Sequence, residues 1–417
     1  MIASHYKDDP RGFLTALFQA AVDAADPAKA LIGQLPAKPK GRTVVIGAGK
    51  GAAQLATAFE DLWDGPLEGA VVTRYGYACA TRHVAVLEAA HPVPDEPGLA
   101  ASTRLLQEVS GLGPDDLVVA LICGGGSALL PAPPDGLGLA DEIAVNQALL
   151  ASGAPIGAMN TVRKHVSRIK GGRLAAAAHP ASVVSLVVSD IPGDNPALVA
   201  SGPTIPDTGN REEALEIIAR FAMDLPQRVM DHLASPIAAA PLPSDAVFDG
   251  HDVRVIASAR KSLEAAQEMA EAAGVRAVIL SDAIEGEARD IGRMHGALAR
   301  EIALHQTPFQ PPVVLLSGGE TTVTVQAKGR GGRNAELALA LAKDIGGLAQ
   351  VTALSADTDG IDGTEDNAGA FADGGTWARL VSEGHDPNAA LAGNDCWGAF
   401  NRLGDLFVTG PTGTNVN

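Results

Sequence analysis

The sequence predicts an α/β fold, and three observations carry that prediction. Short runs of β-branched residues alternate with alanine-rich stretches of helical periodicity, the pattern of strands buried on both faces with crossover helices packed against them. Hydrophobic residues make up 46% of the chain, which excludes a disordered protein. Glycine, at 47 of 417 residues, exceeds the usual share of about 7%, and several glycines directly follow the expected strands.

The individual elements follow from the same patterns. Strands are expected where apolar and β-branched residues run without interruption between turn residues: 43–46, 70–73, 117–122, 183–188, 253–257, 275–280, 313–316 and 351–354. Helices are expected where apolar residues recur three and four positions apart among Ala, Glu and Arg: 11–24, 140–150, 158–169, 211–221, 262–273, 285–305 and 334–345.

The length predicts more than one domain. The 417 residues are close to three times the roughly 150 residues of an average domain. The segment 235–250 has little periodicity and is rich in Pro, Ala and Asp, so a boundary is expected there, with an N-terminal domain of residues 1–240 and a C-terminal domain of residues 250–417. The Pro-rich segment 306–312 is a second candidate, equally compatible with a loop between a helix and a strand.

Composition excludes several classes of protein. A net charge of −18 disfavours general nucleic-acid binding, because a duplex would be repelled by most of the surface. The three cysteines are far apart and form neither a disulfide framework nor a metal motif. Asp8 and Asp9 stand where a signal peptide needs an apolar run, and the apolar runs are too short for a membrane span. We therefore expect a cytoplasmic protein that binds neither nucleic acid nor membrane.

Four expected strands run into glycine-bearing turns, at 44–52, 119–130, 313–321 and 352–363. Ligands of parallel sheets bind beyond the carboxyl ends of strands, and glycine there lets the backbone N–H groups approach a phosphate. One such loop is no more than a tight turn, but four together favour a site that handles phosphate.

The first of these loops has two interpretations. Gly47, Gly49 and Ala52 satisfy a dinucleotide-binding pattern, but the next strand ends at Arg74 in place of the acidic residue that NAD requires, which suggests NADP at most. Lys50, within the loop, is placed to meet phosphoryl oxygens or a carboxylate; the alternative is a solvated loop lysine. The chain has no Walker A motif and no HExxH zinc motif.

Two segments of opposite charge are further candidates. Lys164 and Arg168, in the basic segment 163–173, share a helical face that either attracts an anion or is a solvated surface. The acidic segment 355–373 contains Asp357 and Asp359, which suit Mg²⁺ but also suit turns and helix caps. Asp190, after a buried strand, is a candidate metal ligand or base.

Several motifs together resemble the class II glycerate 2-kinase family. They include VVIGAGKGA (44–52), HPVPD (91–95), CGGGSALLPAP (123–133), NTVRKHVSRIKGGRLA (160–175), SDIPGD (189–194), SGPTIPD (201–207), LSGGETTVTV (316–325), GRGGRNAELAL (329–339) and SADTDGIDGTEDNAGA (355–370). The matches span nearly the whole chain. Members of this family pair a Rossmann-like domain with a smaller MOFRL domain and are often labelled hydroxypyruvate reductases of tartrate breakdown.

The resemblance implies an activity and a site. The activity is ATP-dependent phosphorylation of D-glycerate to 2-phosphoglycerate, with Mg²⁺ accompanying ATP and the active site in the cleft between the domains. The family's proposed catalytic lysine and arginine fall on Lys50 and Arg333. A guanidinium at a helix start can bind phosphoryl oxygens bidentately; the alternative for Arg333 is a salt bridge at the helix terminus with Glu336.

The predicted site then has four parts. Lys50, Arg333 and Asp190 are the expected catalytic residues, with Asp190 orienting or deprotonating the substrate hydroxyl. The expected substrate-binding residues are Gly49, Gly125, Gly126, Ser127, Lys164 and Arg168. The expected nucleotide-binding residues are Gly318, Gly319, Glu320, Arg330 and Asn334. The expected metal ligands are Asp357 and Asp359.

Two other functions stay open. An NAD(P)H-dependent hydroxypyruvate reductase would use the glycine loop and Arg74, and a non-catalytic sensor would bind an acidic metabolite in the same cleft. The expected partners are the small molecules D-glycerate and ATP. The sequence does not fix the oligomeric state, and a homodimer is the assembly to test.

Overall fold

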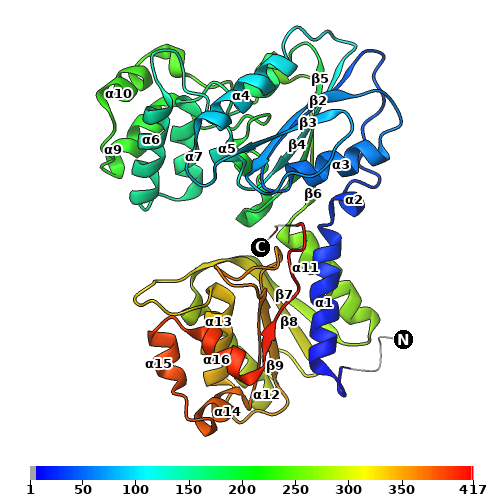
Figure 1. Cartoon of the computed structure of the whole chain (residues 1–417), viewed down its shortest axis with the longest axis vertical. Helices are drawn as coiled ribbons and strands as arrows, with labels where there is room; N and C mark the ends of the chain where they lie inside the picture. The colour runs from blue at the N-terminus through cyan, green and yellow to red at the C-terminus, as the bar shows by residue number, and fades with distance from the viewer. Residues whose placement is uncertain (1–5, 415, 417) are drawn as a thin grey trace. The chain divides into compact units, whose positions relative to one another are not determined.

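The computed structural model describes residues 6–414 and 416 (Figure 1). The chain folds into two compact units. We call Pro27–Ser258 the inserted unit, because it interrupts the other. The second, the split unit, combines the chain up to Asp26 with the chain from Ala259 onward.

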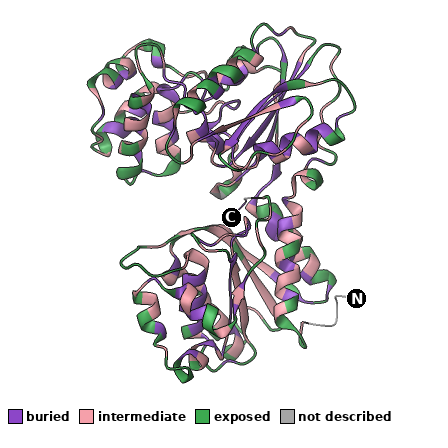
Figure 2. Cartoon of the chain, viewed as in Figure 1, coloured by how far each residue is buried: buried purple, intermediate pink, exposed green. Residues whose placement is uncertain are grey.

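The inserted unit is built on a six-stranded sheet in the order β3-β2-β1-β4-β5-β6, with every neighbouring pair parallel. This is the strand order of the Rossmann fold, which reverses direction between β1 and β4 and binds ligands at that point. β1 and β4 are buried throughout, as Figure 2 shows for the sheet. The strands are β1 Thr43–Ala48, β2 Glu68–Arg74, β3 Val84–Ala89, β4 Leu117–Cys123, β5 Ser182–Val188 and β6 Asp252–Ala257.

The helices of the inserted unit form two groups. α6, α7, α9 and α10 share a hydrophobic core of their own and gather at one end of the sheet (Figure 1). The others connect and cover the strands. The helices are α2 Pro27–Ala30, α3 Ala52–Leu62, α4 Glu96–Glu108, α5 Gly126–Leu129, α6 Leu139–Ala151, α7 Ile156–His165, α8 Arg173–Ala178, α9 Arg211–Arg220 and α10 Gln227–Ala234.

The split unit contains two small sheets. β7 (Arg276–Glu287) and β8 (Val313–Thr322) pair in parallel, whereas β9 (Thr352–Ala356), β10 (Gly369–Asp373) and β11 (Leu406–Phe407) form an antiparallel sheet. The helices are α1 Pro10–Ala24, α11 Ala259–Ala272, α12 Ala288–His305, α13 Arg333–Asp344, α14 Thr376–Ser382, α15 Pro387–Ala392 and α16 Cys396–Leu403.

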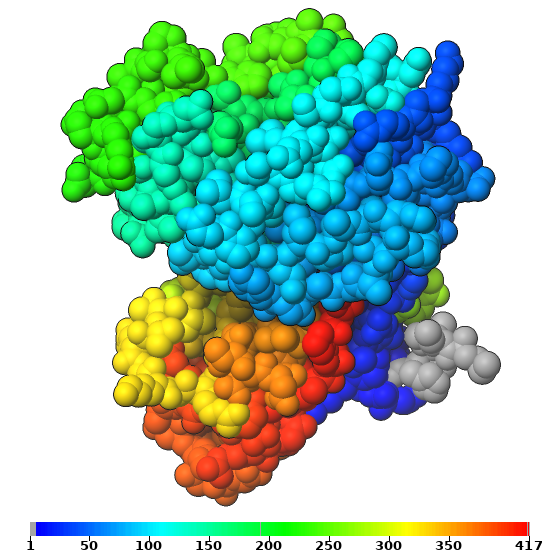
Figure 3. All heavy atoms as spheres, turned by 45° about the horizontal axis from the view of Figure 1, so that its top comes forward, coloured from blue at the N-terminus to red at the C-terminus, as the bar shows by residue number. Residues whose placement is uncertain are grey.

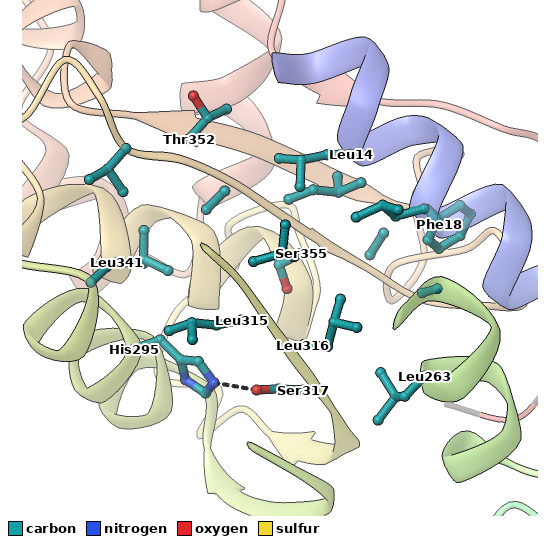
Figure 4. Close-up of a pocket in the computed structure, with 18 of the residues that line it drawn as sticks. Leu14, Phe18, Leu263, His295, Leu315, Leu316, Ser317, Leu341, Thr352 and Ser355 are labelled. Atoms are coloured by element: carbon teal, nitrogen blue, oxygen red, sulfur yellow. Dashed lines mark hydrogen bonds between the residues drawn. The ribbon is translucent and has the colours of Figure 1, made fainter. Parts of the chain in front are cut away.

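A cavity of about 820 Å³ lies inside the split unit, lined by β8, β9 and the helices around them (Figure 4). Its lining is mostly apolar, and Leu14, Phe18 and Leu263 project into it. The imidazole Nε2 of His295 lies 2.8 Å from the hydroxyl of Ser317 at its edge (Figure 4).

Helix α1 belongs to the split unit although it begins the chain. Phe13 and Leu17 of α1 pack in one core cluster with Ala266 of α11. Arg11 donates to Asp405 over 2.6 Å and to Asp373 over 3.0 Å. Figure 3 accordingly shows the dark-blue N-terminal residues against the red C-terminal ones.

The division into units differs from the expected domains of residues 1–240 and 250–417. α1, expected in the N-terminal domain, packs on α11 and ion-pairs beyond residue 370. The strand expected at 253–257, on the C-terminal side of the boundary, is β6, which pairs with β5 in the six-stranded sheet. The α/β class itself is confirmed.

Some element bounds also differ from expectation. The helix expected at 158–169 ends at His165, and the helix expected from residue 285 starts at Ala288, because β7 continues to Glu287. β3, β10 and β11 were not expected. β3, VAVLEA, contains only two β-branched residues among Ala, Leu and Glu, and β10, GAFAD, contains none. β11 has only two residues. None of the three is therefore a continuous β-branched run.

Candidate active site

The glycine loops after β1 and β4 pack directly on each other. Gly49 has φ +133°, and a Cβ there would lie 2.7 Å from the carbonyl carbon of Cys123, so only glycine fits. The N–H of Lys50 donates to the carbonyl of Gly124 over 2.9 Å. The two loops therefore form one platform at the point where the strand order reverses.

Lys50 and His91 both lie over Gly125. A Cβ at Gly125 would be 3.1 Å from Cγ of Lys50 and 3.3 Å from Nε2 of His91. Burial, followed by the charges of Lys50 and Arg74, lowers the pKa of His91. The imidazole is therefore neutral at pH 7 and adds no positive charge beside Lys50.

His91 is a site residue that residue-level reasoning on the sequence missed. It follows β3, an edge strand that was not expected. The available signal was the motif HPVPD, which the family resemblance includes without assigning a role to its histidine.

Asp190 reaches the same platform from the end of β5. A Cβ at Gly124 would be 2.8 Å from the Cβ of Asp190, which places this carboxylate against the β4 loop. Burial first, and the charge of Asp190 in addition, raise the pKa of Cys123 to about 12. Cys123 is therefore a protonated, unreactive thiol, and the structure brings Lys50, Asp190 and the CGGGS loop together.

The basic segment is mostly engaged in the fold. Lys164 is 1% exposed and forms an ion pair with Asp207, and Lys170, equally buried, pairs with Glu142. Arg168 donates through Nε to the carbonyl of Pro133 over 3.0 Å, but half of its side chain is exposed. The contacts of Lys164 are thus those of a structural ion pair, and its role in substrate binding stays a prediction.

In the split unit, Arg333 begins α13 and makes two ion pairs. Nη1 donates to Glu320 over 2.9 Å and Nη2 to Asp357 over 2.6 Å. Burial alone would lower the pKa of Arg333, but the charges and hydrogen bonds of Asp357 and Glu320 outweigh it and raise this pKa. The partner considered from the sequence, Glu336, instead pairs with Arg289 at 2.7 Å.

The start of α13 is held by Asp362. This carboxylate is fully buried and accepts from the N–H groups of Asn334, over 2.9 Å, and Ala335, over 2.8 Å. It therefore satisfies two of the free N–H groups of the first helical turn. The Asn334 side chain points to β9, where it accepts from Ser355 over 2.7 Å.

A second, smaller pocket of about 390 Å³ adjoins Arg333. Backbone at Gly329, Gly331 and Gly332 lines it together with Asp357. Such glycine-rich lining beside a guanidinium is typical of a phosphate-binding site.

The expected nucleotide-binding residues are not among those that line this pocket. Gly318, Gly319 and Glu320 belong to β8, and the first two line the larger cavity together with Asn334. The guanidinium of Arg330 lies 3.6 Å from the ring centroid of Trp397 and pairs with Glu365. No cluster of three or more potential metal-ligating side chains occurs among residues 6–414 and 416.

Comparisons with known proteins agree with these features. The family model described as "Domain of unknown function (DUF4147)" matches residues 13–234, and the MOFRL family model matches residues 313–417. A protein named "Glycerate 2-kinase" from Pyrococcus horikoshii is 38% identical, over 95% of this chain and 93% of its own length. An Agrobacterium vitis protein named "Putative hydroxypyruvate reductase" is 48% identical, over 98% of this chain and 93% of its own length.

A solved structure is also similar. The crystal structure of a glycerate kinase from Thermotoga maritima superposes with a TM-score of 0.90 at 35% identity, covering 98% of each chain. One family model matches more than half of the chain, and relatives of this identity match nearly its full length. Together these matches show the family. The chain therefore belongs to the class II glycerate 2-kinase family, in which a DUF4147 domain is followed by a MOFRL domain.

Proposed function

We propose that the protein is a glycerate 2-kinase, which transfers the γ-phosphoryl group of Mg-ATP to the C2 hydroxyl of D-glycerate. The observation that carries the proposal is Lys50 on its platform of two glycine loops, in a chain similar over nearly its full length to curated glycerate 2-kinases. Phosphoryl transfer needs positioning and charge stabilisation more than covalent chemistry by the protein, and this platform is suited to both.

The inserted unit supplies the groups for the acceptor substrate. The ammonium of Lys50 attracts the glycerate carboxylate and the incoming phosphoryl group. The carboxylate of Asp190, packed on the same loop, orients the hydroxyl or accepts its proton. His91, held neutral, lies close to Lys50 and restricts the space above Gly125.

The split unit supplies groups for the nucleotide. Arg333 and the glycines around the 390 Å³ pocket are suited to phosphate oxygens. Gly318, Gly319, Glu320, Arg330 and Asn334 keep the expected nucleotide-binding role; Glu320 pairs with Arg333, and Gly318, Gly319 and Asn334 line the larger cavity that Arg333 also borders. Arg333 is held by Glu320 and Asp357. Since a guanidinium has five N–H donors, it can meet a phosphoryl oxygen without releasing both carboxylates.

The residues present fit a magnesium ion that arrives with ATP. Mg²⁺ usually takes one or two protein carboxylates and completes its shell with phosphate oxygens and water. Asp357 and Asp359 occupy one turn, in which Oδ1 of Asp357 accepts from the N–H of Asp359 over 3.1 Å. They would hold the ion, which would neutralise charge on the β- and γ-phosphates.

A second candidate function is a nicotinamide-dependent hydroxypyruvate reductase. The strand order and the Gly47-x-Gly49 loop favour it, as do two Agrobacterium vitis relatives, 48% and 50% identical, named "Putative hydroxypyruvate reductase". Against it, β2 ends with Thr73 and Arg74 and offers no carboxylate for the ribose. Arg74 itself stacks on Tyr77, 4.0 Å from the ring centroid.

One experiment separates the candidates. The protein is incubated with D-glycerate and Mg-ATP, and separately with hydroxypyruvate and NADH or NADPH. ADP formation with 2-phosphoglycerate as the product, identified by ³¹P NMR, supports the kinase. Nicotinamide oxidation without ADP contradicts it, and saturable binding without either turnover indicates a sensor. A Lys50→Ala preparation serves as the control for contaminating ATPase.

Assembly and location are part of the proposal. No helix in the described part of the chain is long and apolar enough to cross a membrane. We propose a homodimer located in the cytoplasm, which light scattering on the purified protein and fractionation of cells would test.

A further inference from the structure

A chain of hydrogen bonds leads from the β4 loop into the interior of the inserted unit. The hydroxyl oxygens of Ser127 and Ser201 are 2.8 Å apart, and the Ser201 hydroxyl donates to Oδ1 of Asn160 over 2.9 Å. Ser201 and Asn160 are each 3% exposed, whereas Ser127 is only partly buried. Ser127 therefore links a buried network to the platform around Lys50.

The orientation of the Asn160 amide is fixed by two other contacts. Its Nδ2 donates to the carbonyl of Leu198 over 3.1 Å, and its Oδ1 accepts from Nη1 of Arg163, also over 3.1 Å. A reversed amide would bring two donors together at Arg163 and two acceptors together at Leu198. Oδ1 therefore faces Ser201, and an amide oxygen only accepts.

The orientation of the Asn160 amide sets the direction in which the hydroxyl protons of Ser201 and Ser127 point. A serine hydroxyl has one proton and two lone pairs. The single proton of Ser201 is donated to Asn160, so only a lone pair of Ser201 faces Ser127. The proton of Ser127 is consequently donated to Ser201, and what Ser127 has left for a ligand is a lone pair.

The backbone holds Ser201 in this position. Ala200 and Ser201 both have left-handed conformations, with φ +52° and +61°, which non-glycine residues adopt only when their surroundings hold them. The Ser201 carbonyl accepts from the N–H of Gly171 over 3.0 Å. A Cβ at Gly126 would be 2.7 Å from the Cβ of Ala200, so this turn packs tightly on the β4 loop.

We infer that Ser127 is a hydrogen-bond acceptor for a hydroxyl group of the substrate, with Ser201 and Asn160 as positioning residues that hold it in that state. The inference rests on the proposed function and deepens it. An oxygen that can only accept repels a carboxylate or a ketone oxygen and selects an alcohol. The side chain of Ser127 thus favours a hydroxy acid over the corresponding oxo acid, while Lys50 takes the carboxylate.

This chain of hydrogen bonds does not accept the proton of the substrate hydroxyl. It ends at the amide oxygen of Asn160, which does not become protonated at neutral pH. Ser127 therefore binds and orients the hydroxyl, and any base in the reaction is a different group.

The test measures binding of D-glycerate and of the corresponding oxo acid, hydroxypyruvate, by calorimetry without ATP. In the wild-type protein, hydroxypyruvate should bind more weakly than D-glycerate, because its ketone oxygen meets a lone pair of Ser127. Ser127→Ala removes this repulsion, and Ser201→Ala leaves the Ser127 proton free to turn toward the ketone. Each variant should therefore reduce the preference for D-glycerate over hydroxypyruvate roughly three- to tenfold, the worth of one hydrogen bond.

Two Asn160 variants separate positioning from folding. Asn160→Leu removes the acceptor, so that the Ser201 proton can turn toward Ser127, and should lower the preference for D-glycerate over hydroxypyruvate as Ser201→Ala does. Asn160→Asp keeps an acceptor toward Ser201 and should retain this preference. Ser185→Ala is the matched control, because Ser185 and Thr204 form an equally buried hydroxyl pair at 2.7 Å, separate from this chain; it should lower stability and leave the discrimination unchanged.

The outcomes are distinct. A wild-type preference for D-glycerate over hydroxypyruvate in Ser201→Ala and Asn160→Leu, or a wild-type protein that binds D-glycerate no better than hydroxypyruvate, overturns the inference. Discrimination that depends on Ser127 and Ser201 in a protein that forms no ADP from D-glycerate and Mg-ATP supports the inference and contradicts the kinase.

Discussion

Arg333 and Asp357 form an ion pair, with 2.6 Å between guanidinium Nη2 and carboxylate Oδ2, where α13 begins and β9 ends. The arginine is thereby held in place before a nucleotide binds. We predict that Arg333→Ala lowers kcat by roughly two to three orders of magnitude, the usual loss of a group that stabilises transition-state charge. Arg333→Lys should recover little, because a lysine is not bidentate. Steady-state ADP release measures both, and near-normal turnover in either contradicts the site.

Lys50 should behave in the same way for the acceptor substrate. Lys50→Ala removes the ammonium above Gly125 and should reduce kcat/KM for D-glycerate by at least about a hundredfold, while the circular dichroism spectrum stays unchanged. Lys38→Ala is the matched control, because Lys38 lies in the same unit in an exposed pair with Asp64. A loss of activity in that control would show that the effect is not specific to the site.

The buried pair of Lys170 and Glu142 should be important for stability. Lys170→Met leaves Glu142 as an unpaired charge that is 4% exposed, a change that typically costs about 3–5 kcal/mol. The double variant Lys170→Met with Glu142→Gln should be less damaging, because the glutamine still accepts from the N–H of Ala132. Urea unfolding of the single and double variants measures the difference, and equal stability of the two would contradict this account.

Asp362 should stabilise the start of α13 and, through it, the position of Arg333. Asp362→Ala leaves the N–H groups of Asn334 and Ala335 without their acceptor and should cost about 1–2 kcal/mol. Asp366→Ala, four residues away and exposed, is the control and should be neutral. A thermal unfolding series on the three proteins tests the prediction, which fails if the two variants are equally stable.

Stability should fall under mildly acidic conditions. Burial is the largest cause that lowers the pKa of His91, His165 and His251 from the ordinary value of 6.5. Between that pH and the lower folded-state values, the unfolded chain binds more protons, so stability is lost as the pH falls. The urea midpoint should decrease from about pH 6.5 to pH 5, and His165→Gln should make this decrease shallower. A midpoint that stays constant over this range would contradict the prediction.

The sequence alone predicted the central strands of the six-stranded sheet well, but it predicted the strands and the helix packing of the split unit less well. β1, β4 and β5 are continuous apolar runs because both of their faces are buried, and the expected ranges agree closely. β10, with the sequence GAFAD, has no such run; it pairs with β9, where the carbonyl of Ser355 leaves no room for a side chain at Gly369. The partner of α1 was not predictable either, because it lies more than two hundred positions along the chain.

The candidate site shows the same limit. Lys50 and Ser127 were recognised because glycines surround them in the sequence. The direction of the Ser127 hydroxyl depends on Asn160 and Ser201, which are 33 and 74 positions away, and local sequence does not report that contact. The acidic segment contains several equivalent carboxylates, and only the fold distinguishes the helix cap Asp362 from the partner of Arg333, Asp357.

The placement of α1 has a consequence for biosynthesis. A ribosome makes this helix before the inserted unit, and its packing surface on α11 does not exist until the whole of Pro27–Ser258 has been translated. The apolar face with Phe13 and Leu17 stays uncovered throughout that interval, while the inserted unit can already fold. Deleting the first 26 residues should therefore spare the inserted unit, which can fold earlier, and damage the split unit, which contains α1 and α11.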